Sequence, residues 1–313
     1  MSTETAYVPT PPRVADFMAT SVFGLDRPTS DVTVLYPGLG TGRLYDAVHR
    51  YCTPGEGYVS RFDYDPPKGV AYEIDPDLVD EFETTHPDAD LEIHQTDFLT
   101  TSCDERVDYV LANPPYIHYN DLPEDRRSQY TGRFDTAHGQ YNSYYLFLEQ
   151  ALRALKHGGT LTFLTPIQYL FASNANPLRR ILLRHTFDAF YLMPDAIFDE
   201  STQTMITTLR KVERHPPDFM WSPPSESYFW LESLYKYEHD YFFPDHTEEE
   251  KADLWADYRE LARKLRGPVR RATTTLRSNS NRSTSEQVEL LEYHSEPAAP
   301  SSTSNQVGLS KFG

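Results

Sequence analysis

Short apolar runs alternate with stretches of helical spacing over the first two-thirds of the chain. Runs with the length and composition of buried strands cover residues 32–36, 69–75, 91–98, 107–112 and 160–164. Apolar residues recur at helical spacing over residues 10–18, 44–51, 144–155 and 177–185. Two closely spaced runs, 189–193 and 205–211, follow the last of these helices. This order predicts an α/β fold with a mostly parallel sheet and an antiparallel edge.

Two helix ends are marked by particular residues. Thr10 precedes two prolines and is a candidate N-cap for the first helix, and Gly158-Gly159 is expected to close the helix 144–155. Residues 121–138 predict a polar loop that mixes arginines with aromatic residues, a combination that suits a nucleic-acid backbone and its bases. These residues are Arg126, Arg127, Tyr130, Arg133 and Phe134. A solvated loop without a ligand is the alternative.

The apolar run 107–112 ends abruptly in Asn113-Pro114-Pro115-Tyr116. Two prolines cannot continue a sheet ladder, and ligands of open α/β sheets bind outside the carboxyl ends of the strands. The Asn113 side-chain oxygen and the Pro114 carbonyl can each accept one hydrogen of an exocyclic amino group on a base. This draws the nitrogen towards tetrahedral geometry and frees its lone pair. Tyr116 can stack on a base flipped out of its helix. The alternative is a plain strand-to-loop turn with an aromatic plug.

A glycine-rich turn follows the first predicted strand and precedes a helix. It contains Pro37, Gly38, Gly40 and Gly42, and the context of strand, turn and helix is the one required of a nucleotide-binding loop. Glycines let the backbone approach a ligand closely, and the helix amino terminus offers free N–H groups. The Lys-Ser/Thr pair of the nucleotide hydrolases is missing, which excludes their phosphate loop. A tight turn without a ligand is the alternative.

Acids end the next two predicted strands. Glu73 stands at the tip of the second strand, where a carboxylate can accept hydrogen bonds from both ribose hydroxyls. Asp75 and Asp77 are better explained as acids of a helix start. Asp97 ends the third strand and can accept from the amino group of a cofactor's adenine, while Phe98 packs on the ring. The alternative for Asp97 is a loop cap.

The composition narrows the class of protein further. The chain has 313 residues, a net charge of −18 and only two cysteines, Cys52 and Cys103, too few for a disulfide framework or a zinc site. The acidic surface does not by itself indicate a nucleic-acid partner. One interpretation is a halophilic protein adapted to high salt, and the alternative is an acidic protein from an ordinary cell. The amino terminus has no signal-peptide pattern, and no stretch reaches the ~18 apolar residues of a membrane span. We therefore expect a cytoplasmic protein with no membrane partner.

The pattern changes after residue 212. Residues 213–277 form a small aromatic and basic region in which Thr247-Glu248-Glu249-Glu250 is a capping box that opens a helix to about Arg266. Seven basic residues, six in this region and one just after it, are a candidate phosphate-contacting segment, with a helix followed by disorder as the alternative. They are Arg263, Lys264, Arg266, Arg270, Arg271, Arg277 and Arg282. Residues 278–313 are rich in Ser, Thr, Asn and Pro and predict a disordered tail.

Taken together, residues 8–212 resemble the gamma-class adenine-N6 DNA methyltransferases of restriction–modification systems. The resemblance rests on Thr10-Pro11-Pro12, the turn 37–42, Glu73, Asp97-Phe98 and Asn113-Pro114-Pro115-Tyr116, which stand in family order. It implies a Rossmann-like sheet that binds S-adenosylmethionine and forms a catalytic domain over residues 1–212.

The resemblance also implies the role of each motif. Thr10, the turn 37–42, Glu73 and Asp97-Phe98 bind the cofactor, and Asn113 to Tyr116 is the catalytic motif. Double-stranded DNA is the substrate, with the target adenine flipped between Tyr116 and Phe198 and the region 213–277 as a small target-recognition part. No metal is needed. Because little chain remains after the catalytic domain, we expect any restriction activity to come from a separate endonuclease, or the enzyme to act alone as a regulatory or protective methylase.

Two departures from the family pattern leave alternatives open. Tyr36 stands where the family usually has an acid that contacts the cofactor's amino group, and Tyr141 to Tyr144 stand where another acid is often found. The same amino-methyl transfer also serves enzymes that act on RNA or on a glutamine amide of a protein. A DNA-binding subunit that has kept the fold and lost catalysis is the further alternative, and Tyr36 is the residue that favours it.

Overall fold

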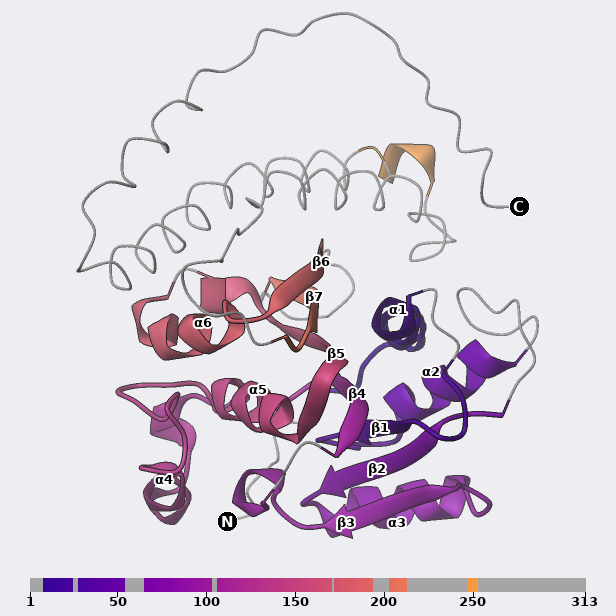
Figure 1. Ribbon diagram of the computed structural model, residues 1–313, viewed down its shortest axis with the longest axis horizontal. Coiled ribbons are helices and arrows are strands. Elements are labelled where there is room, and N and C mark those ends of the chain that lie inside the picture. The colour runs from indigo at the N-terminus through magenta and orange to yellow at the C-terminus, as the bar shows by residue number, and fades with distance from the viewer. Residues whose placement is uncertain are drawn as a thin grey trace, which may run out of the picture.

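The computed structural model describes residues 8–24, 28–53, 65–102, 106–170, 172–193, 203–212, 247–250 and 252. Seven strands form one sheet in the order β3-β2-β1-β4-β5-β7-β6 (Figure 1). They are β1 (Thr33–Tyr36), β2 (Lys68–Glu73), β3 (Leu91–Gln95), β4 (Val107–Ala112), β5 (Leu155–Pro166), β6 (Thr186–Leu192) and β7 (Thr204–Arg210). Strands β1 to β5 pair in parallel, and β7 is antiparallel to both β5 and β6. The mostly parallel sheet with an antiparallel edge is confirmed.

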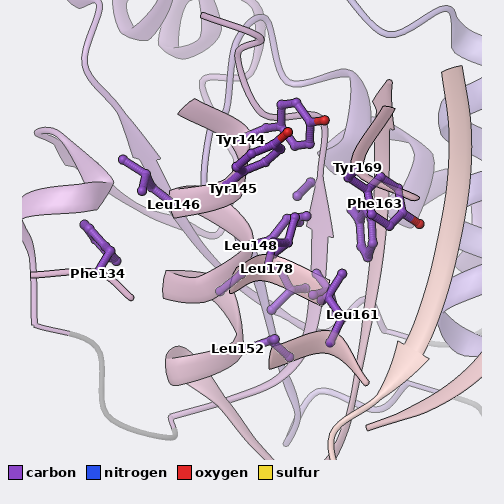
Figure 2. Packing of buried hydrophobic residues seen from close by; sticks show 14 of the residues in the cluster. Phe134, Tyr144, Tyr145, Leu146, Leu148, Leu152, Leu161, Phe163, Tyr169 and Leu178 are labelled. Carbon is purple, nitrogen blue, oxygen red and sulfur yellow. The ribbon is translucent and has the colours of Figure 1, made fainter. Parts of the chain in front are cut away.

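Helices cover both faces of the sheet (Figure 1). They are α1 (Pro12–Phe23), α2 (Arg43–Cys52), α3 (Pro76–Thr85), α4 (Glu124–Tyr130), α5 (Ser143–Ala154) and α6 (Asn176–Leu182). Successive residues of a strand point to opposite faces, so neighbours in one strand enter different cores. In β1, Val34 packs in the core under α1 and α2, whereas Leu35 packs in the core under α5. Figure 2 shows the core under α5, where Leu148 of α5 lies near Leu161 and Phe163 of β5.

The strand order explains where a ligand can bind. Strand β1 pairs with β2 on one side and with β4 on the other. Strands β2 and β3 therefore extend the sheet in one direction from β1, and β4 and β5 extend it in the opposite direction. In open α/β sheets the crevice at such a switch point, outside the carboxyl ends of the strands, is the usual ligand site. The register Leu35↔Val110 sets the end of β1 beside the end of β4. The glycine turn and the Asn-Pro-Pro-Tyr motif therefore leave the sheet at neighbouring positions.

Three local predictions were wrong. Residues 121–138 are not a continuous loop, because α4 occupies Glu124–Tyr130, with two acids in its first turn. Gly158 and Gly159 do not close α5, because they lie inside β5, where a side chain on Gly159 would meet the Asp108 carbonyl oxygen at 2.7 Å. Thr10 is not the N-cap of α1, because Pro11 holds that position without a side-chain cap.

Some predictions concern residues outside the described part of the chain. Phe198, Cys103 and residues 253–313 lie outside it, so the predicted second aromatic and the basic run stay predictions. The capping box is confirmed, since the Thr247 backbone N–H donates to Glu250 Oε2 at 2.8 Å and the Glu250 N–H donates to Thr247 Oγ1 at 3.3 Å. None of the helices in the described residues is both long and apolar enough to cross a membrane.

Candidate active site

The glycine turn is folded back onto the carboxyl end of β2. The Leu39 N–H donates to the Tyr72 carbonyl at 3.0 Å, and the Gly40 N–H donates to Glu73 Oε2 at 2.8 Å. Gly40 and Gly42 have φ values of 56° and 82°, a region that residues with side chains rarely adopt. Gly38 has no atom within 4 Å of the place where a Cβ would stand, so the turn is open to a ligand there.

Glu73 ties the turn to the start of α3. Its carboxylate is buried, and the second oxygen accepts the Ile74 N–H at 2.9 Å and the Asp75 N–H at 3.0 Å. An ionised carboxylate offers about four acceptor positions, so these three backbone donors leave room for a ribose hydroxyl. Asp75 caps α3 by accepting from the Asp77 N–H at 3.0 Å, which confirms that both of these acids belong to a helix start.

Tyr36 does not take over the role expected of an acid at the end of β1. Its ring is buried in the core under α1 and α2 and lies edge-on to Tyr45, with the ring centroids 6.1 Å apart. Burial raises the pKa of the Tyr36 hydroxyl well above its usual value, so the group stays neutral. The end of β1 therefore offers no charge from this residue to a ligand's amino group.

Asp97 is held by three donors. Its Oδ1 accepts the Leu99 N–H at 2.9 Å, as a loop cap would, and its Oδ2 accepts from the Tyr130 hydroxyl at 2.8 Å and from Arg126. Burial and the neighbouring Asp97 charge raise the pKa of Tyr130, so the hydroxyl keeps its proton and donates. Phe98 is buried against Tyr72, with ring centroids 5.1 Å apart.

These contacts correct one expectation about nucleic-acid binding. Tyr130 and Phe134 are both buried, so neither ring is available for stacking on a base. Arg126 pairs with Asp97, and Arg133 donates to the Thr101 carbonyl. Arg126, Tyr130 and Arg133 attach α4 and its flank to the segment that follows β3. Sequence reasoning missed this role because the partners lie about thirty residues apart, 29 for Arg126 and 33 for Tyr130.

Asn113 leaves the end of β4 with its side-chain amide fixed from two sides. Its Nδ2 donates to the Val8 carbonyl at 3.1 Å and to Thr10 Oγ1 at 3.0 Å. Its Oδ1 accepts from the Tyr116 hydroxyl at 2.8 Å. An amide oxygen has two lone pairs, so Oδ1 can accept a second hydrogen while Tyr116 donates to it. Thr10 thus lies beside the Asn-Pro-Pro-Tyr motif, and its predicted contact with the cofactor stays a prediction.

Tyr116 is held at both its hydroxyl and its ring. The hydroxyl lies 3.0 Å from the Leu164 carbonyl as well as near Asn113, and its one hydrogen is shared between these two acceptors. The ring lies edge-on to Tyr144, with centroids 5.8 Å apart. Tyr144 is buried, and burial raises its pKa well above the usual value. Tyr116 itself is half-buried.

The first turn of α5 fixes the remaining backbone of the motif. Ser143 Oγ donates to the Pro115 carbonyl and accepts the Ile117 N–H at 2.9 Å, and the Ser143 N–H donates to the Ile117 carbonyl at 2.8 Å. Asn142 caps α5 by accepting from the Tyr144 N–H. Sequence reasoning noted that this segment lacks the usual acid, but it did not find Ser143. A serine after a capping asparagine carries no sign of a partner 28 residues away.

Comparisons with known proteins agree with this geometry. A sequence model of the Eco57I restriction-modification methylase family matches residues 65–192. The type II methyltransferase M.TthHB8I of Thermus thermophilus is 29% identical over 214 residues, which are 65% of this chain and 44% of that protein. The resemblance to restriction–modification methyltransferases is confirmed. The chain spans less than half of the length of M.TthHB8I.

Solved structures agree on the fold. A protein of Listeria monocytogenes assigned to the class I S-adenosylmethionine-dependent methyltransferases has a TM-score of 0.57 at 18% identity, covering 77% of this chain and 74% of that one. The methyltransferase subunit of a type I restriction-modification system from Streptococcus thermophilus has a TM-score of 0.51 at 21% identity, covering 67% of this chain and 45% of that one. The sheet is therefore Rossmann-like, as in these two methyltransferases.

The residues at the switch point fit S-adenosylmethionine as the cofactor. The open space beside Gly38 admits a ligand against the turn, and Glu73 keeps an acceptor position for a ribose hydroxyl. The cofactor's positively charged amino group has no acid at position 36 to receive it. When bound, the cofactor would supply an activated methyl group.

Proposed function

We propose that this chain is a site-specific DNA methyltransferase that transfers a methyl group from S-adenosylmethionine to the N6 amino group of an adenine. The observation that carries the proposal is the Asn113 amide, whose Nδ2 is bound on one side so that Oδ1 is the atom left for a substrate amino group. The matches to restriction-modification methylases support DNA as the substrate. A cognate restriction endonuclease is the proposed partner, unless the methylase acts alone.

The mechanism follows from what these groups can accept. The amino group of adenine is a weak nucleophile, because its lone pair is delocalised into the ring. Asn113 Oδ1 and the Pro114 carbonyl each accept one of its two hydrogens, which makes the nitrogen more tetrahedral and turns the lone pair towards the methyl group. The hydrogen-bonding atoms are fixed before the substrate arrives, so little reorganisation is needed in the transition state. With the cofactor bound, the N–C bond would form as the bond between the methyl carbon and the sulfonium sulfur breaks, and S-adenosylhomocysteine would be the leaving group. The surplus amino proton would then pass to water, so no strong base is required.

The base must leave the duplex to reach these atoms. Tyr116 is proposed to stack on one face of the flipped adenine and Phe198 on the other, and the region 213–277 is proposed to read the DNA sequence around it. The edge-on contact with Tyr144 and the hydroxyl contacts of Tyr116 support the first role, because they hold the ring rigid. Residues 1–212 are proposed as the catalytic domain.

The test is methylation mapping by long-read sequencing of plasmid DNA from cells that express the protein, with N6-methyladenine measured by mass spectrometry of the digested DNA. Wild-type protein should mark adenine in one sequence context. Asn113→Ala should lower the rate by about 10²- to 10³-fold, as loss of one preorganised polar contact does in other enzymes. Asn120→Ala is the matched control, because Asn120 is exposed and should leave the rate unchanged.

The other outcomes separate the alternatives. Cofactor binding with no mark on DNA would refute the proposal and turn attention to RNA or to a glutamine amide. Neither cofactor binding nor a mark would favour the non-catalytic DNA-binding subunit, and the buried Tyr36 is the observation on its side. All assays should be run across salt concentrations, because the net charge of −18 makes folding sensitive to ionic strength.

A further inference from the structure

The orientation of the Asn113 amide is determined by its partners. The Val8 carbonyl can only accept a hydrogen bond, so the group that faces it at 3.1 Å must be the NH₂ end of the amide. The second hydrogen of this group goes to Thr10 Oγ1 at 3.0 Å. On the opposite side Oδ1 receives the Tyr116 hydroxyl. A rotation by 180° would place Oδ1 against the Val8 carbonyl, where two acceptors face each other, so this contact decides the orientation. The Thr10 hydroxyl secures the NH₂ end in that orientation by accepting its second hydrogen.

Helix α1 fixes where the two acceptors lie. Its inner face, which includes Val14, Phe17 and Met18, is buried against the sheet in the core it shares with α2. Pro12 opens the helix, and the Ala15 N–H already donates to the Pro11 carbonyl at 3.0 Å. Thr10, directly before these prolines, is buried and does not cap the helix. Its hydroxyl is therefore left to interact with the end of β4.

We propose that Thr10 is a positioning residue for methyl transfer, which holds the Asn113 amide with Oδ1 towards the substrate amino group. This inference rests on the proposed function. With the amide reversed, Asn113 would present two N–H donors to an amino group that also donates, and the lone pair would not be freed. The role assigns Thr10 to the reacting nitrogen rather than to recognition of the cofactor.

The kinetic test compares Thr10→Val, which keeps the shape and removes the acceptor, with Thr10→Ser, which keeps the hydroxyl. One neutral hydrogen bond contributes about 0.5–1.5 kcal/mol, so Thr10→Val should lower kcat by about 3- to 10-fold. The Kd for S-adenosylmethionine and the KM for DNA should change less than about 2-fold, because the contact acts on the transition state. Thr10→Ser should restore kcat to within about 2-fold of wild type. A Thr10→Val variant with weaker cofactor binding and normal kcat at saturation would overturn the proposal.

A spectroscopic test needs no turnover. In protein labelled with ¹⁵N-asparagine, the side-chain NH₂ signals of Asn113 are identified by their loss in Asn113→Ala. Thr10→Val should shift the signal of one NH₂ hydrogen upfield. The signal of the other hydrogen, which is bound to the Val8 carbonyl, should stay close to its wild-type position. Unshifted signals would overturn the proposal. If wild-type protein binds cofactor and marks no DNA, the proposed function fails, and the Asn113 signals still decide whether Thr10 holds the amide.

Discussion

Two glycines of the same turn should respond in opposite ways to alanine. Gly42 has φ +82° at the N-cap of α2, and a Cβ there would lie 2.5 Å from two ring carbons of Phe82. Gly38 has no positive φ, and a Cβ there would meet no atom within 4 Å. We therefore expect Gly42→Ala to destabilise the fold, and Gly38→Ala to leave the stability unchanged while it obstructs the cofactor.

The magnitude for Gly42→Ala has two parts. A side chain in the left-handed region costs about 1–2 kcal/mol. The overlap with Phe82 adds about 1–3 kcal/mol, as overpacking of a core does, because the ring cannot move away. Phe82 is stacked on His86 with centroids 4.4 Å apart and lies edge-on to Tyr45 at 5.4 Å. The sum, about 2–5 kcal/mol, is a large part of the ~5–15 kcal/mol that holds most domains folded.

The assay is urea unfolding followed by circular dichroism, with the free energy of unfolding extrapolated to water, and calorimetric titration with S-adenosylmethionine. Gly38→Ala should unfold within ~0.5 kcal/mol of wild type and bind the cofactor at least about 10-fold more weakly. A Gly42→Ala variant as stable as wild type would refute the steric argument. Equal destabilisation of both variants would show that the turn has no open side at Gly38.

Three further predictions concern the loop that follows β4, pH and salt. Ser143→Ala leaves the Pro115 carbonyl and the Ile117 N–H without their partner, so it should cost about 1–3 kcal/mol in urea unfolding and lower kcat, whereas the exposed Ser128→Ala should do neither. Burial lowers the pKa of His49 below 6.5, so the unfolded chain takes up the proton first as the pH falls, and stability should drop from pH 7 to pH 5. His49→Gln should flatten this dependence of the urea midpoint, and an unchanged slope would show that another group causes it. With a net charge of −18, the melting temperature should rise steadily towards molar KCl, and full stability in dilute buffer would contradict the halophilic interpretation.

The sequence by itself determined the features that depend on neighbouring residues. Alternation of apolar runs and helical spacing predicted the α/β order, and the prolines and glycines that follow β4 and β1 marked where those strands stop. Glu73 and Asn113 could be found because each ends a strand, and the carboxyl ends of parallel strands meet at one edge of a sheet. The pairing of β1 with both β2 and β4 then makes that edge a switch point.

Only the tertiary structure decided which side chain each of these residues meets. Thr10 and Asn113 are 103 positions apart, and Asp97 meets Arg126 and Tyr130 across about thirty. The sequence pattern did not predict helix α4, because the helix buries little apart from Tyr130 and therefore lacks an apolar stripe. A residue's preference for helix, strand or turn depends on its own chemistry and on its neighbours along the chain. Its hydrogen-bond partner depends on how distant segments pack, and in this protein that packing orients the amide at the end of β4.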